Sequence, residues 1–215
     1  MQDSYKHKGL RQKLIDSLRV KGIRDENVLE AMNRVPRHMF MDSSFVNHAY
    51  TDKAFPISSG QTISQPYTVA FQTELLQVSK HQKVLEVGTG SGYQCAVLVE
   101  LGARVYTIER IKQLYASARD QLTALGYKPG FYYGDGYEGL PAFSPFDRIL
   151  VTAGAPEIPG KLADQLGPGG RMVIPVGDNL GQKMILVEKN ETGEITVSEH
   201  GYFSFVPLLQ GKVNS

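Results

Sequence analysis

Apolar residues recur at helical spacing near the start of the chain. A helix is predicted over residues 9–20, where leucine and isoleucine side chains share one face. A second is predicted between Asp25, a suitable N-cap, and Pro36, because a residue that precedes proline avoids helical geometry. A third begins at Pro66 as its first residue and runs to about residue 78. Helices therefore precede any predicted strand.

From residue 83 onward, short apolar runs alternate with helical patterns. Strands are predicted at 83–87, 104–108, 131–133, 147–152, 171–175, 183–188 and 195–203, and helices at 93–101, 111–125 and 159–166. Intervening helices make the earlier strands parallel, whereas a short turn makes the last two antiparallel. The pattern predicts an α/β fold with a doubly wound, mainly parallel sheet, helices on both faces, antiparallel C-terminal strands and an N-terminal helical extension.

Between residues 36 and 66 the periodicity fades and turn-forming residues collect. An irregular segment of this length inside a compact domain is typically functional. We therefore expect it to contain a loop that covers a ligand.

Composition and charge limit the number of domains, the partners and the metal chemistry that we expect. The chain has 215 residues, which predicts a single domain: residues 1–80 supply helices and an active-site loop, and 81–215 the cofactor-binding core. A net charge of +1 predicts no nucleic-acid partner, and no apolar run is long enough to predict a membrane span. The single cysteine, Cys95, excludes an internal disulfide, and no zinc-type spacing occurs, so no metal site is expected. We expect a cytoplasmic monomer.

Glycine occupies every second position where the first strand meets its helix, at Gly88, Gly90 and Gly92. Doubly wound sheets bind ligands at such strand ends, and glycine lets the backbone approach a ligand closely. Dinucleotide folds use a different spacing, G-x-G-x-x-G, so the dehydrogenase interpretation weakens. With the acidic Glu86 in front, this turn resembles motif I of the class I S-adenosylmethionine methyltransferases. The structural alternative is a tight turn that holds no ligand.

Acidic residues also follow the next two strands. Glu109 ends the second strand, where a carboxylate can accept hydrogen bonds from ribose hydroxyls. Asp135, beside Gly136, closes the third strand and is placed to accept from an adenine amino group. An ordinary solvated acid is the alternative at each position. The order of the three turns favours the methyltransferase cofactor.

Five segments carry a more specific resemblance. They are VPRHMF at 35–40, QTISQPY at 61–67, GDGYEG at 134–139, LGPGGRMVIPVG at 166–177 and FVPL at 205–208. Together they resemble the protein-L-isoaspartate O-methyltransferase family over nearly the whole chain. The family has a Rossmann-like methyltransferase fold, and its members use S-adenosyl-L-methionine, release S-adenosyl-L-homocysteine and act on isoaspartyl-containing proteins and peptides.

The resemblance also implies site residues. Ser64 matches the active-site serine, whereas Tyr67 stands where some members carry histidine, so Tyr67 receives no role. The substrate-binding segment is Val206, Pro207 and Leu208. The expected cofactor contacts are Gln61, Thr62, Ile63, Ser64, Glu86, Gly88, Gly90, Ser91, Gly92, Glu109, Asp135 and Gly136.

The chemistry of the implied acceptor limits what these residues must do. An α-carboxyl has a pKa of roughly 3.3–3.7, so the isoaspartyl carboxylate is ionised at neutral pH and needs no general base. Ser64 is then expected to orient one carboxylate oxygen through its hydroxyl rather than to act as a nucleophile. Its structural alternative is a cap for the helix that begins near Pro66.

Two other functions stay open from the residues alone. One is a methyltransferase that acts on RNA or a small molecule, and the other is a non-catalytic protein that only binds the cofactor. We interpret His38 and Cys95 as packing residues.

Overall fold

The computed structural model describes residues 2–178 and 181–214. Its helices are α1 (Tyr5–Val20), α2 (Glu26–Arg34), α3 (Pro66–Leu76), α4 (Tyr93–Glu100), α5 (Lys112–Ala124) and α6 (Gly160–Asp164). Its strands are β1 (Phe55–Pro56), β2 (Thr62–Ile63), β3 (Lys83–Val87), β4 (Arg104–Glu109), β5 (Gly130–Tyr133), β6 (Phe146–Val151), β7 (Leu166–Asp178), β8 (Gly181–Lys189) and β9 (Ile195–Phe203). Short 3-10 helices lie at Arg37–Phe40, Ser43–His48, Ser58–Gly60 and Pro141–Phe143.

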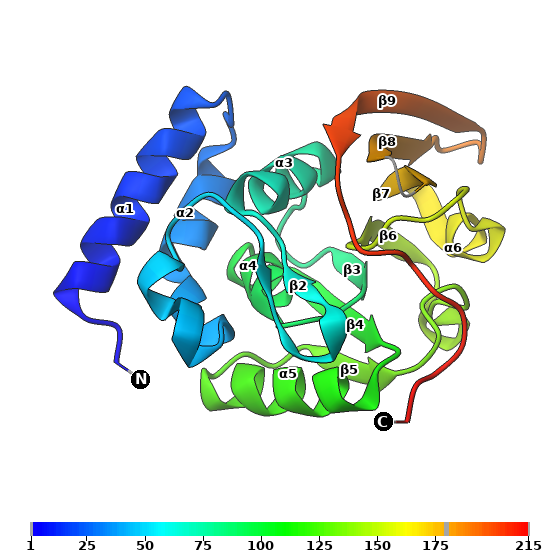
Figure 1. Cartoon of the computed structure of the whole chain (residues 1–215). Helices are drawn as coiled ribbons and strands as arrows, with labels where there is room; N and C mark the ends of the chain where they lie inside the picture. Colours follow the sequence, from blue (N-terminus) through cyan, green and yellow to red (C-terminus); the bar gives the residue numbers. More distant parts are fainter. Residues whose placement is uncertain (1, 179–180, 215) are drawn as a thin grey trace.

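The main sheet has seven strands in the order β5-β4-β3-β6-β7-β8-β9 (Figure 1). Neighbours from β5 to β7 are parallel, whereas β8 is antiparallel to both β7 and β9. The predicted α/β fold with antiparallel C-terminal strands is confirmed. The central strands β3 and β6 are buried at 84–87 and 149–151, where every residue except Glu86 is apolar, as expected for parallel strands covered on both sides.

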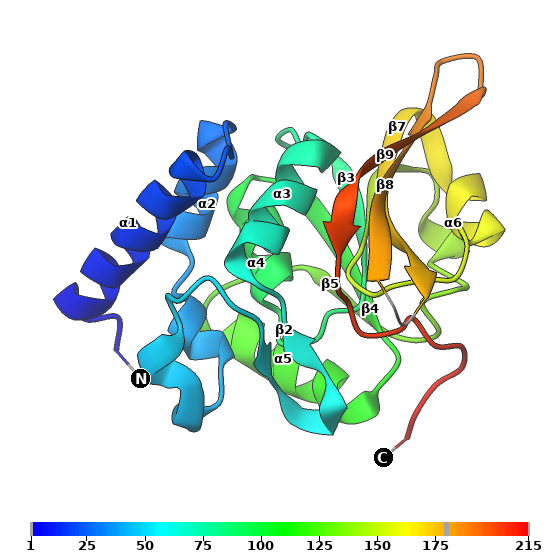
Figure 2. The same ribbon diagram turned by 45° about the horizontal axis from the view of Figure 1, so that its top comes forward.

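The two faces of the sheet are covered unequally. Helices α3, α4 and α5 pack on one face, and α1 and α2 form a further layer outside α3 and α4 (Figures 1 and 2). On the other face, Leu85, Ile149 and Met172 pack with Leu162 of α6 and with Leu208 of the C-terminal segment. The prediction of helices on both faces holds, but α6 is the only α-helix that covers this second face in the described chain.

Several element boundaries differ from the sequence prediction. The first helix begins at Tyr5 rather than residue 9, because Ser4 caps it by accepting from the backbone N–H of His7. The helix predicted over 159–166 covers only Gly160–Asp164, because β7 begins at Leu166, where it pairs with Phe146. Glycines and a proline at 167–170 hid the first part of this strand from a periodicity argument.

The segment predicted as irregular, 36–66, contains one short antiparallel pair, β1 with β2, and three 3-10 helices. A two-residue strand is too short to show alternation, which explains why the sequence did not predict it.

The C-terminal segment returns across the carboxyl ends of the parallel strands (Figure 1). It forms a parallel bridge between Gly154 and Pro207 and another between Ile111 and Val213. Residues 207–213 are thereby placed beside the loops that follow β6 and β4. Among the described residues, no helix is both long and apolar enough to cross a membrane.

The turn between β3 and α4 generates a first prediction. Gly92 has a φ of +87°, and an added Cβ would lie 2.9 Å from Cδ1 of Leu122, whereas Gly126 has a φ of +86° with nothing within 4 Å. Gly126→Ala should cost about 1–2 kcal/mol of unfolding free energy through its left-handed backbone alone. Gly92→Ala should cost about 1–3 kcal/mol more, because the buried Leu122 side chain must also shift. Chemical denaturation measures both, and equal losses would contradict the packing argument.

Candidate functional site

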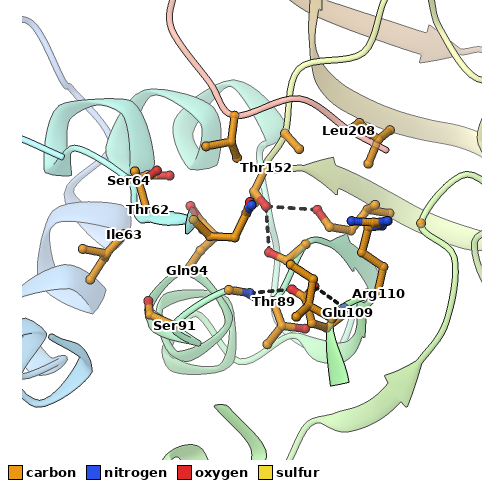
Figure 3. A pocket seen from close by; sticks show the side chains of 18 of the residues that line it. Thr62, Ile63, Ser64, Thr89, Ser91, Gln94, Glu109, Arg110, Thr152 and Leu208 are labelled. Atoms are coloured by element: carbon orange, nitrogen blue, oxygen red, sulfur yellow. Dashed lines mark hydrogen bonds between the residues drawn. The ribbon is translucent and has the colours of Figure 1, made fainter. Parts of the chain in front are cut away.

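A cavity lies at the carboxyl ends of β3, β4 and β6 (Figure 3). Its empty volume is about 820 Å³, counted out to its open mouth. The active-site loop, the glycine turn, the end of β4 and the C-terminal segment each supply a wall. The lining includes residues 61–64, 87–91, 108–111, 152–153 and 206–209.

The glycine turn is fixed by contacts between neighbouring strand ends. Gly88 has a φ of +94°, and an added Cβ would lie 2.5 Å from Oγ1 of Thr152. The Thr152 hydroxyl lies 3.0 Å from the carbonyl oxygen of Val87 and 2.7 Å from that of Gly88, and donates to them. A side chain at position 88 would therefore displace the residue that holds the turn.

Glu109 joins the same turn to the end of β4. One carboxylate oxygen accepts from the backbone N–H of Gly90 at 3.0 Å, and the other accepts from that of Ile111 at 2.9 Å. The side chain lines the cavity, and each carboxylate oxygen has capacity for a further hydrogen bond. The predicted ribose role of Glu109 fits this position.

Glu86 lies behind the turn instead of at the cavity wall. It is fully buried, and its Oε2 accepts from the Thr107 hydroxyl at 2.6 Å. Thr107 is in turn 2.6 Å from the hydroxyl of Thr89, which does line the cavity. Burial raises the pKa of Glu86 to about 8, so the carboxyl is mainly protonated at neutral pH. Glu86 is therefore linked to the cavity indirectly, through the hydroxyl groups of Thr107 and Thr89.

Ser64 lies where the cavity meets a second, more open groove. The groove is formed by the start of α3, the end of β9 and the segment that follows. Four residues line both spaces: Thr62, Ser64, Thr152 and Val206. The Ser64 hydroxyl has no hydrogen-bond partner among the described residues, and α3 has Gln65 at its N-cap without any side-chain cap bond. The capping alternative for Ser64 therefore finds no support.

The other predicted residues divide into two groups. Gln61, Ile63, Ser91, Gly136 and the segment 206–208 line the cavity, but Gly92 and Asp135 do not. The Asp135 carboxylate accepts from the backbone N–H of Tyr137 and from that of Gly211 in the C-terminal segment. Its adenine contact stays a prediction.

Thr152 and Gln94 are two of the lining residues that the sequence prediction did not name. Thr152 follows β6, so the strand-end argument applied to the first three strands would also have found it. Gln94, on α4, donates from Nε2 to the Thr73 hydroxyl at 3.0 Å, and its buried Oε1 has no partner within the described chain. No local motif marks Gln94, because its partner lies on another helix.

His38 and Cys95 occupy packing positions. His38 is buried, with Nδ1 2.7 Å from the Tyr50 hydroxyl and its ring stacked on His7 at a centroid distance of 3.9 Å. Asp3 lies nearby, but its carboxylate pairs with Arg11. Burial raises the pKa of the Cys95 thiol, which keeps it neutral. Neither residue lines the cavity.

Comparison with known proteins agrees with the fold and identifies the family. The family model described as protein-L-isoaspartate(D-aspartate) O-methyltransferase matches residues 9–213. A relative from Cytophaga hutchinsonii, named protein-L-isoaspartate O-methyltransferase, is 61% identical over 209 residues, which covers 97% of this chain and 95% of the relative. One of the same name from Christiangramia forsetii is 57% identical over 213 residues, covering 99% and 100%.

Solved structures extend the likeness to three dimensions. A protein-L-isoaspartate O-methyltransferase structure matches with a TM-score of 0.84 at 29% identity, covering 95% of this chain and 67% of that one. A Plasmodium falciparum structure described under the same enzyme name, in complex with S-adenosyl-L-homocysteine, matches at 0.79 and 25% identity, covering 93% and 98%. The fold and its strand-end cavity thus define a Rossmann-like methyltransferase. The chain belongs to the protein-L-isoaspartate(D-aspartate) O-methyltransferase family.

The buried carboxyl of Glu86 generates a prediction for pH dependence. Unfolding lowers its pKa from about 8 to 4.5, so the folded state binds more protons between these values and stability falls as the pH rises. Glu86→Gln cannot titrate, and its unfolding free energy relative to the wild type should rise across that window, by up to about 1.4 kcal/mol per pH unit. Urea denaturation at several pH values measures the difference. Parallel stability curves for the two proteins would refute the assignment.

Proposed function

We propose that this protein transfers a methyl group from S-adenosyl-L-methionine to the free carboxylate of L-isoaspartyl residues in damaged proteins. The observation that carries the proposal is the position of Ser64. Its hydroxyl has no partner in the described chain, and the residue lines both the cavity and the more open groove. One space suits a small cofactor, and the other can admit part of a protein.

The residues of the cavity fit the proposed cofactor. Glu109 has hydrogen-bond capacity for ribose hydroxyls, and Gln94 adds a polar side chain to the lining. Arg110 donates to the backbone carbonyls of Gln210 and Gly211, so its guanidinium is already engaged with the C-terminal segment. This engagement makes Arg110 a poorer ion-pair partner for the pyrophosphate of a dinucleotide. When bound, the cofactor supplies an electrophilic methyl group on a sulfonium.

The groove supports a protein carboxylate as acceptor. Its lining combines aromatic side chains with hydroxyls and contains neither lysine nor arginine among the described residues. A nucleic acid would call for basic side chains, so the RNA alternative is disfavoured. A carboxylate that is already ionised needs orientation and exclusion of water instead of proton removal.

In this mechanism Ser64 donates a hydrogen bond to one oxygen of the acceptor and leaves the other free to attack. Thr62, Thr152 and Val206 surround the same junction and limit the access of water. A non-catalytic role is disfavoured because simple cofactor storage would not require an open groove beside the cavity. In the cell, we propose a cytoplasmic monomer of one domain that acts on isoaspartyl proteins and has no nucleic-acid or membrane partner.

Ser64→Ala should lower turnover on an isoaspartyl peptide by about tenfold or more, because the acceptor loses an orienting donor. The affinity for S-adenosylmethionine, measured by calorimetry, should change little. Ser91→Ala is a matched control: Ser91 lines the cavity but not the groove, so its loss should affect cofactor affinity more than turnover. A wild-type turnover in Ser64→Ala would remove the hydroxyl from the mechanism.

Glu109→Ala should weaken cofactor binding by about 1–3 kcal/mol, because buried ribose hydroxyls would lose a charged acceptor. Glu109→Gln keeps an acceptor and should lose less. Calorimetry with S-adenosyl-L-homocysteine measures both, with circular dichroism to check the fold. An unchanged affinity would contradict the ribose role.

The activity itself is tested with two peptides that differ only in an isoaspartyl or ordinary aspartyl linkage. Methyl transfer should occur to the first and be nearly absent for the second. Equal transfer to both, or transfer only to RNA, would overturn the proposed function.

A further inference from the structure

A buried arginine fixes the chain just before the active-site loop. Arg37 is fully buried, and its Nε donates to the carbonyl oxygen of Ala49 at 3.0 Å. Its Nη2 donates to that of Lys53 at 3.3 Å, and the guanidinium lies 5.0 Å from the centre of the Tyr93 ring. Burial lowers the pKa of Arg37 to about 10, which still leaves it charged at neutral pH. The segment 49–53 is thereby tied to α4.

The fixed segment presents Asp52 to the start of α3. Oδ1 of Asp52 accepts from the backbone N–H of Tyr67 at 2.8 Å. Oδ2 accepts from Nε2 of Gln65 at 3.2 Å and from Nζ of Lys21 at 2.5 Å. The Asp52 side chain is only 11% exposed, so these bonds are shielded from water. The Asp52 carboxylate therefore joins its own segment to the start of α3 and to the end of α1.

Helix α3 needs this contact because its own sequence supplies no cap. Gln65 at the N-cap makes no cap bond, and Pro66 has no N–H to donate. The N–H of Tyr67 is then the first free donor of the helix, and a carboxylate there also interacts favourably with the helix dipole. Asp52 acts as a cap supplied from a distant segment.

The cap lies directly beside the proposed catalytic loop. Ser64 immediately precedes Gln65, whose amide donates to both the carboxylate and the backbone carbonyl of Asp52. The upstream end of the loop is held by the pairing of β2 with β1, so Asp52 holds the downstream end. Between these two anchors the Ser64 hydroxyl itself is free of partners in the described chain.

We propose that Asp52 is a positioning residue for methyl transfer, which sets the direction of the Ser64 hydroxyl by clamping Gln65 and the first turn of α3. This inference rests on the proposed function and on the role of Ser64 in it. Lys21, at the end of α1, is the third member of the clamp and connects the N-terminal helices to the site. Its side chain is 47% exposed, so its contribution is smaller.

The test is a double-mutant cycle between Asp52→Ala and Ser64→Ala, with isoaspartyl peptide turnover as the readout. Alone, Asp52→Ala should lower kcat by about tenfold, because a misplaced orienting group loses most of its effect. In the Ser64→Ala background the same change should lower kcat less than about twofold. Affinity for S-adenosyl-L-homocysteine should stay within about threefold, since Asp52 does not line the cavity.

Two further variants keep the test decisive. Asp52→Asn retains an acceptor for the Tyr67 N–H and should recover much of the lost rate, even where Asp52→Ala folds poorly. Asp42→Asn is the matched control, because Asp42 is exposed, also caps a short helix, through the N–H of Ser44, and lines neither the cavity nor the groove. Hydrogen exchange at the Tyr67 amide should accelerate in Asp52→Ala and not in Asp42→Asn.

The possible failures are distinguishable. If the wild type does not methylate the isoaspartyl peptide, the proposed function fails. If it does, but the losses from Asp52→Ala and Ser64→Ala simply multiply, Asp52 acts on general stability and the inference is overturned. A wild-type rate in Asp52→Ala would overturn it as well.

Discussion

The parallel pairing of β3 with β4 and β6 is the constraint on which the site depends. Parallel strands end at the same edge of a sheet, so the turns that follow them meet in one place. The backbone of Gly90 can then bond Glu109, and Thr152 can bond the carbonyls of the glycine turn. Without this shared edge, the residues of the cavity would be scattered.

Around that edge, the active-site loop depends on segments outside the sheet. The β1–β2 pair holds its upstream end, and the Asp52 carboxylate holds its downstream end. Arg37, from the VPRHMF segment, fixes the chain that carries Asp52. The VPRHMF segment thus supports the loop at 61–67 through the chain at 49–53, although the two motifs are far apart in sequence.

Two buried ionisable groups show how burial and pairing set charge in this protein. Arg37 keeps its charge because two backbone carbonyls and an aromatic face replace water. Glu86 has hydroxyl and thiol neighbours but no cation beside it in the described chain, so burial favours its neutral form. Glu109, in front of it, has different partners, because its two oxygens accept backbone N–H groups.

The sequence alone determined the order of the elements, the mixed sheet, the glycine turn and the family, because periodicity and local motifs are properties of neighbouring residues. It predicted roles for Ser64, Glu109 and the 206–208 segment, all of which line the cavity. Only the tertiary structure decided that Glu86 lies behind the turn, that Thr152 and Gln94 line the cavity, and that the Asp52 carboxylate bonds Gln65 and the start of α3. Each of these depends on a partner distant in sequence, whose direction and burial no local pattern specifies.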